Sequence, residues 1–295
     1  MILRKQYGLS KKSKISYKLN SSNIYLPQIP VTHRDEEYEQ DGFVMLREMQ
    51  EKHFWYRGRH RFLLGALERQ LAKASTIRSA IDLGGGAGGW VSYLAAKRPG
   101  MFDQLALADS SLQALKYAED VLPPSAQRYQ IDLMDLRMHE EWDVAFLLDV
   151  IEHLNDDQRA LEQAKDALKP GGLLFVTTPA FQQFWSYNDD LAHHQRRYTR
   201  ADFNRLAAAV GLTLLDARYF MFYLSPLYLL SRIKPGFDKL NEREKKALSI
   251  SQHAIPVKPI NGLLSAIFCA ETPLGHWWHF PWGTSVLGVF RKPFN

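Results

Sequence analysis

The sequence predicts an α/β protein with a doubly wound, mostly parallel, seven-stranded sheet. Short apolar segments alternate with helical segments from residue 79 onward, as in parallel sheets covered by helices on both faces. A glycine-rich turn follows the first of these apolar segments. The chain has 295 residues, of which 46% are hydrophobic and 23% charged, and this length and composition suit a sizeable globular core.

The elements can be placed in order along the chain. Before the sheet, residues 35–76 are expected to be helical, because Phe62, Leu63, Ala66 and Leu67 recur at helical spacing. Helices are also predicted at 90–100, 112–120, 156–172 and 199–212, the last with Thr199 as its N-cap and Gly211 as its stop. The seven strands are predicted at 79–85, 104–111, 128–136, 142–150, 173–180, 213–220 and 284–293.

These elements divide the chain into five segments. Up to Arg34 there are seven Lys or Arg and no Asp or Glu, so this basic tail carries +7 and the rest of the chain −2 of the net +5. We expect the tail to be flexible. The other four segments are a helical lid at 35–76, a core at 77–220, a helical insertion at 221–281 on the substrate or membrane side, and a final strand at 282–295.

Cysteine and hydropathy patterns favour a cytoplasmic protein. The only cysteine, Cys269, excludes an internal disulfide and a cysteine-based zinc cluster. No apolar segment of the secretory type follows the first basic residues. The longest uncharged apolar run, Tyr219 to Ser231, has 13 residues, too few to span a bilayer but enough to lie on a membrane surface. A peripheral membrane contact is therefore kept open.

The glycine-rich turn "AIDLGGGAGGW" satisfies two nucleotide-binding patterns at once. Gly84, Gly86 and Gly89 spell the dinucleotide fingerprint G-x-G-x-x-G, whereas Asp82, Gly84, Gly86 and Gly88 spell D-x-G-x-G-x-G. Asp109 lies 21 residues past Gly88 at the end of the second strand, where a carboxylate can bind a ribose diol in either class of ligand.

Two carboxylates favour S-adenosylmethionine over a dinucleotide. Asp82 would repel a pyrophosphate, but it suits a ligand with a cationic amino-acid group. Asp132 follows the third strand, where it can accept a hydrogen bond from an adenine amino group. A nicotinamide-dependent dehydrogenase remains the less favoured alternative.

The order of the motifs resembles that of the class I S-adenosylmethionine-dependent methyltransferases. The resemblance covers residues from about 50 to 220 and the last strand, and it rests on "DLGGGAGG", "LADSS", "QIDLMDL", "WDVAFLLDVIEHL" and "LKPGGLLFVTTPA". Within that family, "HFWYRGRHRFL" and "HHQRRYTRADFNRL" look most like the ubiquinone-type O-methyltransferase branch. One departure is Gly85 before Gly86, where a Cys-Gly or Thr-Gly pair is frequent.

The resemblance implies a set of cofactor contacts. Asp82 and the backbone at Gly84, Gly86 and Gly88 would hold the methionine part of the cofactor. Asp109 would bind both ribose hydroxyls. The remaining implied contacts are Asp132 and Leu133 at the adenine, and Leu148 and Asp149 beside the sulfonium.

Candidates for the chemistry lie after the fourth and fifth strands. A hydroxyl acceptor needs its proton removed, and imidazole suits that task near neutral pH, so His153 is favoured over His194 as the base. In the ubiquinone-type branch, residues matching Asp149, Glu152, His153 and His194 can bind a divalent metal, although here Asp149 stands for the usual Glu. We favour a packed polar network at these residues, so no metal is expected.

Aromatic residues before the first strand suggest a lid over the cofactor. Trp55 or Tyr56 would exclude water, and Arg57, or else Arg61, would meet the cofactor carboxylate or an anionic substrate. The alternative is an ordinary amphipathic helix start. Trp185 and Tyr198 are further substrate or lid candidates, and the aromatic-rich insertion suggests an apolar substrate tunnel or a dock on a membrane.

The sequence therefore predicts an S-adenosylmethionine-dependent methyltransferase of a small or lipid-like molecule, acting on oxygen in a biosynthetic pathway. The rival of another class is a catalytically inactive partner protein that binds the same cofactor. No nucleic acid is expected as a partner, because no RNA-binding module is recognised beside the basic tail. The oligomeric state is left open.

Overall fold

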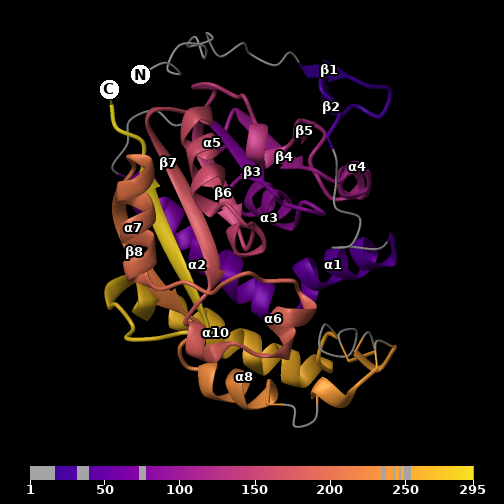
Figure 1. The fold of residues 1–295 in the computed structure, drawn as a ribbon, viewed down its shortest axis with the longest axis vertical. Coiled ribbons are helices and arrows are strands. Elements are labelled where there is room, and N and C mark those ends of the chain that lie inside the picture. The colour runs from indigo at the N-terminus through magenta and orange to yellow at the C-terminus, as the bar shows by residue number, and fades with distance from the viewer. Residues whose placement is uncertain are drawn as a thin grey trace, which may run out of the picture.

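The protein is built on one twisted sheet, shown in Figure 1. The computed structural model describes residues 17–31, 40–72, 78–233, 237–241, 243–245, 247–248 and 254–294. Within them the sheet has nine strands in the order β1-β2-β5-β4-β3-β6-β7-β9-β8. The strands are β1 (Tyr17–Leu19), β2 (Tyr25–Pro27), β3 (Ser79–Leu83), β4 (Gln104–Asp109), β5 (Gln127–Gln130), β6 (Trp142–Leu148), β7 (Leu168–Pro179), β8 (Thr213–Phe220) and β9 (Ser285–Arg291).

Seven of these strands are the ones the sequence predicts, and they confirm the fold class. β3 to β7 are mutually parallel where they pair, whereas β9 runs antiparallel to both β7 and β8. The chain enters at β3, proceeds outward to β4 and β5, and then returns to the other side of β3 with β6. In such sheets ligands bind beyond the carboxyl ends of the strands at this switch point.

Nine helices accompany the sheet in the described part of the chain. Four precede or follow the first strands of the core: α1 (Gln40–Lys52), α2 (Phe54–Leu71), α3 (Gly89–Lys97) and α4 (Leu112–Tyr117). The other five are α5 (Asp157–Ala167), α6 (Tyr187–Leu191), α7 (Arg200–Val210), α8 (Ser225–Ser231) and α10 (Lys258–Trp277). The helix expected at 156–172 ends five residues early, because Pro170 and Gly171 belong to the start of β7 and the φ of Gly171 is +77°.

The helices cover both faces of the sheet, and alternating strand residues separate two apolar cores. Ile81 and Leu83 of β3 pack with α5 and α7 on one face. Ala80 of the same strand packs on the other face with α2, α3 and Phe268 of α10. α2, which was expected to belong to a lid, is therefore a core helix, and α1 alone lies over α3 and α4.

A hairpin replaces part of the expected flexible tail. β2 pairs in parallel with β5 at Tyr25 and Tyr129, whose rings stack with centroids 4.6 Å apart. Ile24 is fully buried, and the Tyr17 hydroxyl donates to the Leu136 carbonyl at 3.2 Å. Burial of these residues fixes the segment, so the expectation of a flexible tail is wrong for residues 17–31, while residues 1–16 lie outside the described part.

The insertion expected at 221–281 contains α8 and α10. α10 packs along α2 and against β8, and Figure 1 shows α8 and α10 along the lower edge of the molecule. Residues 234–236, 242, 246 and 249–253 of this insertion lie outside the described residues, as do 35–39 and 73–76 of the expected lid. No helix among the described residues combines the length and hydropathy needed to cross a bilayer.

Candidate functional site

A cavity of about 620 Å³ opens at the carboxyl ends of the central strands. Its walls come from the turns after β3, β4, β5 and β6, from α1 and the start of α2, from the segment between β7 and α7, and from α8 and α10. We call the part around Gly84–Gly86 the glycine end. We call the part around Glu152, His153 and His194 the histidine end. The strand order places the two ends side by side, because β6 is the neighbour of β3.

The glycine end is shaped by backbone turns. Gly84 and Gly86 have φ angles of +79° and +55°, which favour glycine. A Cβ added at Gly84 would lie 2.8 Å from a methyl carbon of Val150, while one at Gly86 would meet only Leu46 at 3.4 Å. The turn is held by the Gly84 N–H, which donates to the Ala108 carbonyl at 2.7 Å. The backbone of this loop therefore faces the cavity.

Gly88 has a different role from the other two glycines. It precedes α3 with a φ of +80°, and an added Cβ would crowd Leu122, Ala118 and Leu107. It does not belong to the cavity wall. Gly88 therefore shapes the loop and the start of the helix, rather than contacting a ligand in the way the resemblance implies.

Two carboxylates flank the glycine turn. Asp109 Oδ2 accepts from the Gly86 N–H at 2.9 Å, and its Oδ1 accepts from the Ser111 N–H at 2.8 Å. Asp82 is 2% exposed and its Oδ1 has no hydrogen-bond partner within the described structure. Burial raises the pKa of Asp82 to about 7, with a further upward contribution from Asp109 that the Arg59 charge opposes. Both Asp residues line the cavity.

The residues expected at the adenine lie at the rim after β5. Leu133 lines the cavity beside Ile131. Asp132 is exposed and lies outside the wall, and its carboxylate accepts from the Met134 N–H at 2.8 Å. Its position at the mouth leaves the outer side of the carboxylate accessible. The structure therefore brings Leu133 to the cavity and Asp132 only to its edge.

Arg59 lines the cavity, as do Arg197 and Arg232. The Arg59 guanidinium pairs with the Asp149 carboxylate and lies 5.0 Å from the Trp55 ring centroid and 5.1 Å from that of Tyr56. Its Nε is buried and has no hydrogen-bond partner among the described residues. Arg57, which was expected to bind the cofactor, is exposed and outside the wall, and Arg61 is exposed as well. Of Arg57, Arg59 and Arg61, Arg59 is the one that lines the cavity.

Helical periodicity contains the signal that identifies Arg59. It precedes Phe62, Leu63 and Ala66 by three, four and seven residues, so it shares the buried face of α2 with them. Arg57 and Arg61 fall on the opposite side of the helix. The prediction of Arg57 or Arg61 rested on the composition of the segment. It did not extend the apolar stripe of α2 back to residue 59.

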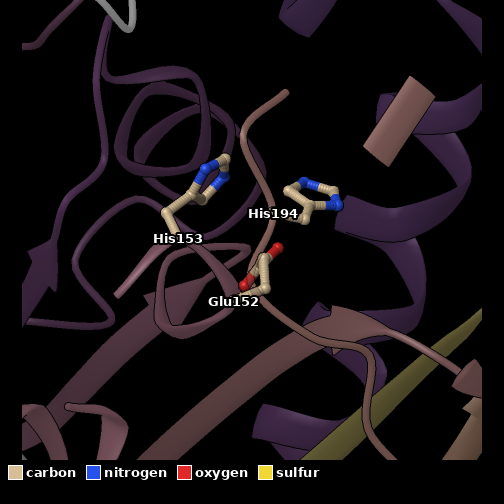
Figure 2. A group of neighbouring side chains, drawn as sticks. All are labelled: Glu152, His153 and His194. Atoms are coloured by element: carbon tan, nitrogen blue, oxygen red, sulfur yellow. The ribbon is translucent and has the colours of Figure 1, made fainter. Parts of the chain in front are cut away.

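Glu152, His153 and His194 come together at the histidine end. Each offers one possible ligand atom, and these atoms lie within 4.8 Å of one another. The two imidazole centroids are 4.8 Å apart, and in Figure 2 the Glu152 carboxylate lies below and between the rings. Asp149, the fourth residue of the implied metal set, is not part of this group, because it pairs with Arg59 and accepts from the Thr177 hydroxyl.

Burial strongly affects this cluster. Glu152 is fully buried, and neither carboxylate oxygen has a hydrogen-bond partner among the described residues. Burial, with the nearby Asp149 charge, raises the pKa of Glu152 well above its usual range. Burial, with the neighbouring His194, lowers the pKa of His153 to about 4. His153 Nδ1 is buried and has no hydrogen-bond partner among the described residues. The His153 ring nevertheless forms a hydrogen bond with the Ala192 backbone.

His194 is oriented by a buried ion pair. Its Nδ1 lies 2.9 Å from Asp189 Oδ1, and Arg197 donates to both Asp189 oxygens at 2.7 and 2.8 Å. Burial alone would raise the pKa of Asp189, but the hydrogen bonds from His194 and Arg197 hold that pKa well below its usual range. An ionised Asp189 requires a proton on His194 Nδ1, so the Nε2 of a neutral His194 is the acceptor.

The lid candidates divide into two groups. Trp55 and Tyr56 line the cavity, as does Leu148, the strand residue expected near the reacting centre. Trp185 lies outside the wall and its indole N–H donates to Asp190 at 2.9 Å. Tyr198 is 2% exposed, and its hydroxyl donates to Asp157 at 2.8 Å, beneath the cavity. Tyr198 therefore packs in the core, and neither of these two residues contacts the cavity.

The cavity suits the methionine part of S-adenosylmethionine. The partner-free Asp82 Oδ1 and the partner-free Arg59 Nε both belong to buried side chains of cavity-lining residues. Their opposite charges match the ammonium and the carboxylate of an amino-acid group. The space beside Gly86, where no Cβ intrudes, admits a ligand close to the backbone.

Comparison with known proteins agrees with this site. A family model described as a methyltransferase domain matches residues 54–217, more than half of the chain. Phosphoethanolamine N-methyltransferase 2 of Haemonchus contortus, solved with S-adenosyl-L-methionine, is similar in structure with a TM-score of 0.57 and 17% identity, over 91% of this chain and 62% of that chain. None of the curated proteins matches the sequence significantly.

A second similar structure covers almost the whole of its own chain. It comes from the complex between the Haloferax volcanii Trm112 methyltransferase activator and a methyltransferase, with a TM-score of 0.56 and 15% identity, over 90% of this chain and 99% of that chain. Such distant likenesses establish the fold, and the family model establishes the membership. The chain belongs to the methyltransferase-domain family and is a class I S-adenosylmethionine-dependent methyltransferase.

Proposed function

We propose that the protein methylates an oxygen atom of a small or lipid-like acceptor held at the histidine end of the cavity. The observation that carries this proposal is the Asp189–His194 pair, which orients an imidazole toward the cavity beside the reacting centre. When bound, S-adenosylmethionine supplies a methyl group on a sulfonium. Every other requirement of the reaction falls to the residues of this chain.

At the glycine end, the residues bind and orient the cofactor. Asp82 attracts its ammonium, and Arg59 its carboxylate. Asp109 receives the ribose, while Leu133 packs on the adenine and Asp132 meets the adenine amine at the rim. Leu148 and Asp149, at the end of β6, lie between the two ends of the cavity and so beside the sulfonium.

At the histidine end, His194 rather than His153 acts as the base. A pKa lowered to about 4 makes His153 a weak proton acceptor, whereas the Asp189 carboxylate stabilises the imidazolium that forms when His194 takes a proton. The acceptor hydroxyl gives its proton to His194 Nε2, its oxygen bonds to the methyl carbon, and the carbon–sulfur bond breaks to leave a neutral thioether. Alignment of the two reactants supplies much of the rate.

The acceptor is proposed to be largely apolar. Phe54, Leu224, Leu227, Tyr228 and Leu264 line the cavity, and they come from the start of α2, from α8 with the turn before it, and from α10. This wall matches the aliphatic or aromatic body of a small or lipid-like molecule. An oxygen acceptor and the aromatic "HFWYRGRHRFL" segment also support the ubiquinone-type branch as the subgroup.

The test is to follow the methyl group. The purified protein would be incubated with methyl-labelled S-adenosylmethionine and matched phenol, alcohol and amine acceptors of increasing apolar length, and mass spectrometry would locate the label. Label on oxygen supports the proposal, and label on nitrogen or carbon corrects the acceptor atom. Tight cofactor binding without transfer to any acceptor would favour the inactive partner protein instead. A cytoplasmic location stays a prediction for cell fractionation.

A divalent metal at Glu152, His153 and His194 is the second candidate. It is favoured by the buried carboxylate without a partner and by the Asp189 and Ala192 contacts of the two imidazoles, which resemble the outer contacts of metal ligands. A bound metal would acidify the acceptor hydroxyl. Calorimetric titration with Zn²⁺ and Mg²⁺, compared with a Glu152→Gln variant, distinguishes the candidates, because only a metal site gives binding that this variant loses.

A further inference from the structure

α10 exposes apolar residues on its outer side, although its inner side buries several polar residues beside the core residue Phe268. Its buried residues include Asn261, Ser265, Glu271 and Thr272. Its exposed residues include Leu263 at 62% and Trp277 at 87% of their full exposure. A helix on a soluble protein usually turns its apolar stripe inward and its charged side outward. The outer side of α10 therefore has the composition of a surface that meets an apolar medium.

Beyond its exposed first residue, Lys258, the outer side of α10 carries no charge. From Pro259 to Trp277, a stretch that is fully described, no exposed position carries a charged side chain. A helix of this length extends for about 30 Å. The exposed positions are Pro259, Ile260, Gly262, Leu263, Ala266, Ala270, Pro273, Leu274 and Trp277.

Hydrogen bonds fix the polar side of α10 inward. The Asn261 side chain accepts from the Phe54 N–H and donates to the Lys52 carbonyl, both at 2.8 Å. Glu271 accepts from the Phe222 and Tyr223 N–H groups at 2.7 and 3.1 Å. Rotation of α10 would leave these buried polar groups unsatisfied, which costs free energy. The exposed apolar side is thus a consequence of the way the helix is anchored.

α8 extends the same apolar side. Leu227 and Leu230 are three residues apart and so share one side of α8, and Tyr223 and Ile233 lie just before and just after this helix. They are between 50% and 68% exposed. Trp278 and Trp282, at 56% and 44%, lie just beyond the end of α10. We call these exposed residues of and around α8 and α10, with the two tryptophans, the apolar edge; the two helices lie at the bottom of Figure 1.

The net charge of the insertion that contains α8 and α10 has the sign that attracts anionic lipid. Residues 221–281 contain seven Lys or Arg and four Asp or Glu, and one of the four, Glu271, is fully buried. Residues 1–34 carry +7, so everything outside these two segments carries a net −5. Exposed Lys239, Arg243 and Lys258 lie in the insertion itself. The basic charge is thus concentrated in the tail and near the apolar edge.

We propose that the apolar edge docks the protein on the surface of an anionic lipid bilayer. Leucine and tryptophan side chains enter the boundary between headgroups and acyl chains, and neighbouring Lys and Arg bind the headgroups. Tryptophan is well suited to this position because its ring is apolar and its N–H is polar. The edge lies on the surface and does not cross the bilayer.

The docked position would connect the bilayer with the cavity. Leu227 is 57% exposed at the apolar edge and also lines the cavity, together with Tyr228 and Leu264. A lipid-like acceptor can therefore pass from the bilayer to the histidine end without crossing water. This route rests on the proposed function, whereas docking itself does not.

The experiment is flotation of the full chain with two kinds of vesicle. One contains phosphatidylcholine alone, and the other contains about 30% phosphatidylglycerol in phosphatidylcholine. The wild-type protein is expected to float with the anionic vesicles at least fivefold more than with the neutral ones. The double variant Leu263→Glu, Leu274→Glu should lower the partition coefficient about tenfold or more, because it removes apolar contacts and adds repelled charges. Leu19→Glu with Ile29→Glu, at similarly exposed positions far from α10, should change it less than twofold.

Three results would overturn the proposal. The first is wild-type protein that stays with neither vesicle, and the second is equal loss in the two double variants. The third is a dimer, seen by sedimentation without lipid, that the α10 variant dissociates, because the edge would then be a protein interface. Calorimetry with S-adenosylmethionine on the same samples separates the two proposals, since docking without cofactor binding would contradict only the proposed function.

Discussion

The glycine end and the histidine end of the cavity are built in different ways. At the glycine end, backbone turns at Gly84 and Gly86 leave space, and Asp109 holds the turn by accepting from two N–H groups. At the histidine end, side chains from β6 onward and from the segment before α7 meet with several polar atoms left unsatisfied, those of Glu152 among them. The glycine end is held by its backbone turns, whereas the histidine end is built from buried charged side chains.

This difference separates binding from chemistry. A turn fixed by strand ends is already ordered before a ligand arrives, so changes there should weaken cofactor binding. A cluster whose pKa values are displaced by burial is typical of groups that transfer protons or bind metals. Changes there should lower the rate of transfer and leave cofactor affinity nearly unchanged. Four variants test this separation, in order of decreasing effect.

The largest effect is expected from His194→Asn. Loss of the base should lower kcat by about 10²–10⁴-fold, while the Kd for S-adenosylmethionine stays within about twofold. Steady-state kinetics and calorimetry would measure the two quantities. His193→Asn is the matched control, because His193 is exposed and its φ of +55° is one that asparagine tolerates. Equal losses in both variants would remove the base from His194.

Asp109→Ala should affect the other end. It leaves the Gly86 and Ser111 N–H groups without their acceptor and removes the partner of the ribose, so we expect the Kd for S-adenosylmethionine to rise about 100-fold. Asp103→Ala, which removes only a 3.6 Å surface pair with Arg78, should leave the Kd unchanged. Calorimetry would show both. A Kd for Asp109→Ala within threefold of wild type would contradict the assigned role of this carboxylate.

The pH dependence of cofactor binding should report Asp82. Its pKa, raised to about 7 chiefly by burial, means that the carboxyl is protonated below neutral pH and must lose that proton to bind an ammonium. Affinity should therefore rise with pH by up to about tenfold per unit below pH 7 and level off above it. Asp82→Asn should flatten this dependence in calorimetry between pH 5.5 and 8. An unchanged slope in the variant would assign the titration to another group.

The same carboxyl should affect stability with the opposite slope. Because the pKa of Asp82 is raised in the folded protein, its contribution to stability is present at low pH and is lost as pH rises through about 7. Chemical denaturation of the ligand-free protein should show that Asp82→Asn, which cannot ionise, is less sensitive to pH than wild type over this range.

The smallest effect is expected from Arg57→Ala. Arg57 is exposed and outside the cavity wall, so its removal should change the Kd for S-adenosylmethionine by less than about twofold. Arg59→Gln is the comparison, because it leaves Asp149 without its cation and removes the partner of the cofactor carboxylate. If Arg57→Ala weakened binding tenfold and Arg59→Gln did not, Arg57 would be the residue that binds the cofactor carboxylate, as the sequence predicts.

Local sequence patterns were sufficient to predict most of the glycine end. Asp82, Gly84, Gly86 and Asp109 could be placed because a parallel sheet brings the carboxyl ends of neighbouring strands to one edge. The histidine end was only partly predictable. Glu152 and His153 are neighbours in sequence, but the role of His194 depends on Asp189 and Arg197, which no spacing rule connects to it.

The sequence by itself determined the alternation of strands and helices, the cofactor loop and the family, because these depend on short-range periodicity and on the side-chain type needed at each turn. Only the tertiary structure decided that residues 17–31 join the sheet and that Tyr198 is core. It also decided the outward apolar side of α10, because the anchors Asn261 and Glu271 have partners 48 to 209 residues away. Contacts at such separations leave no periodic trace in the chain.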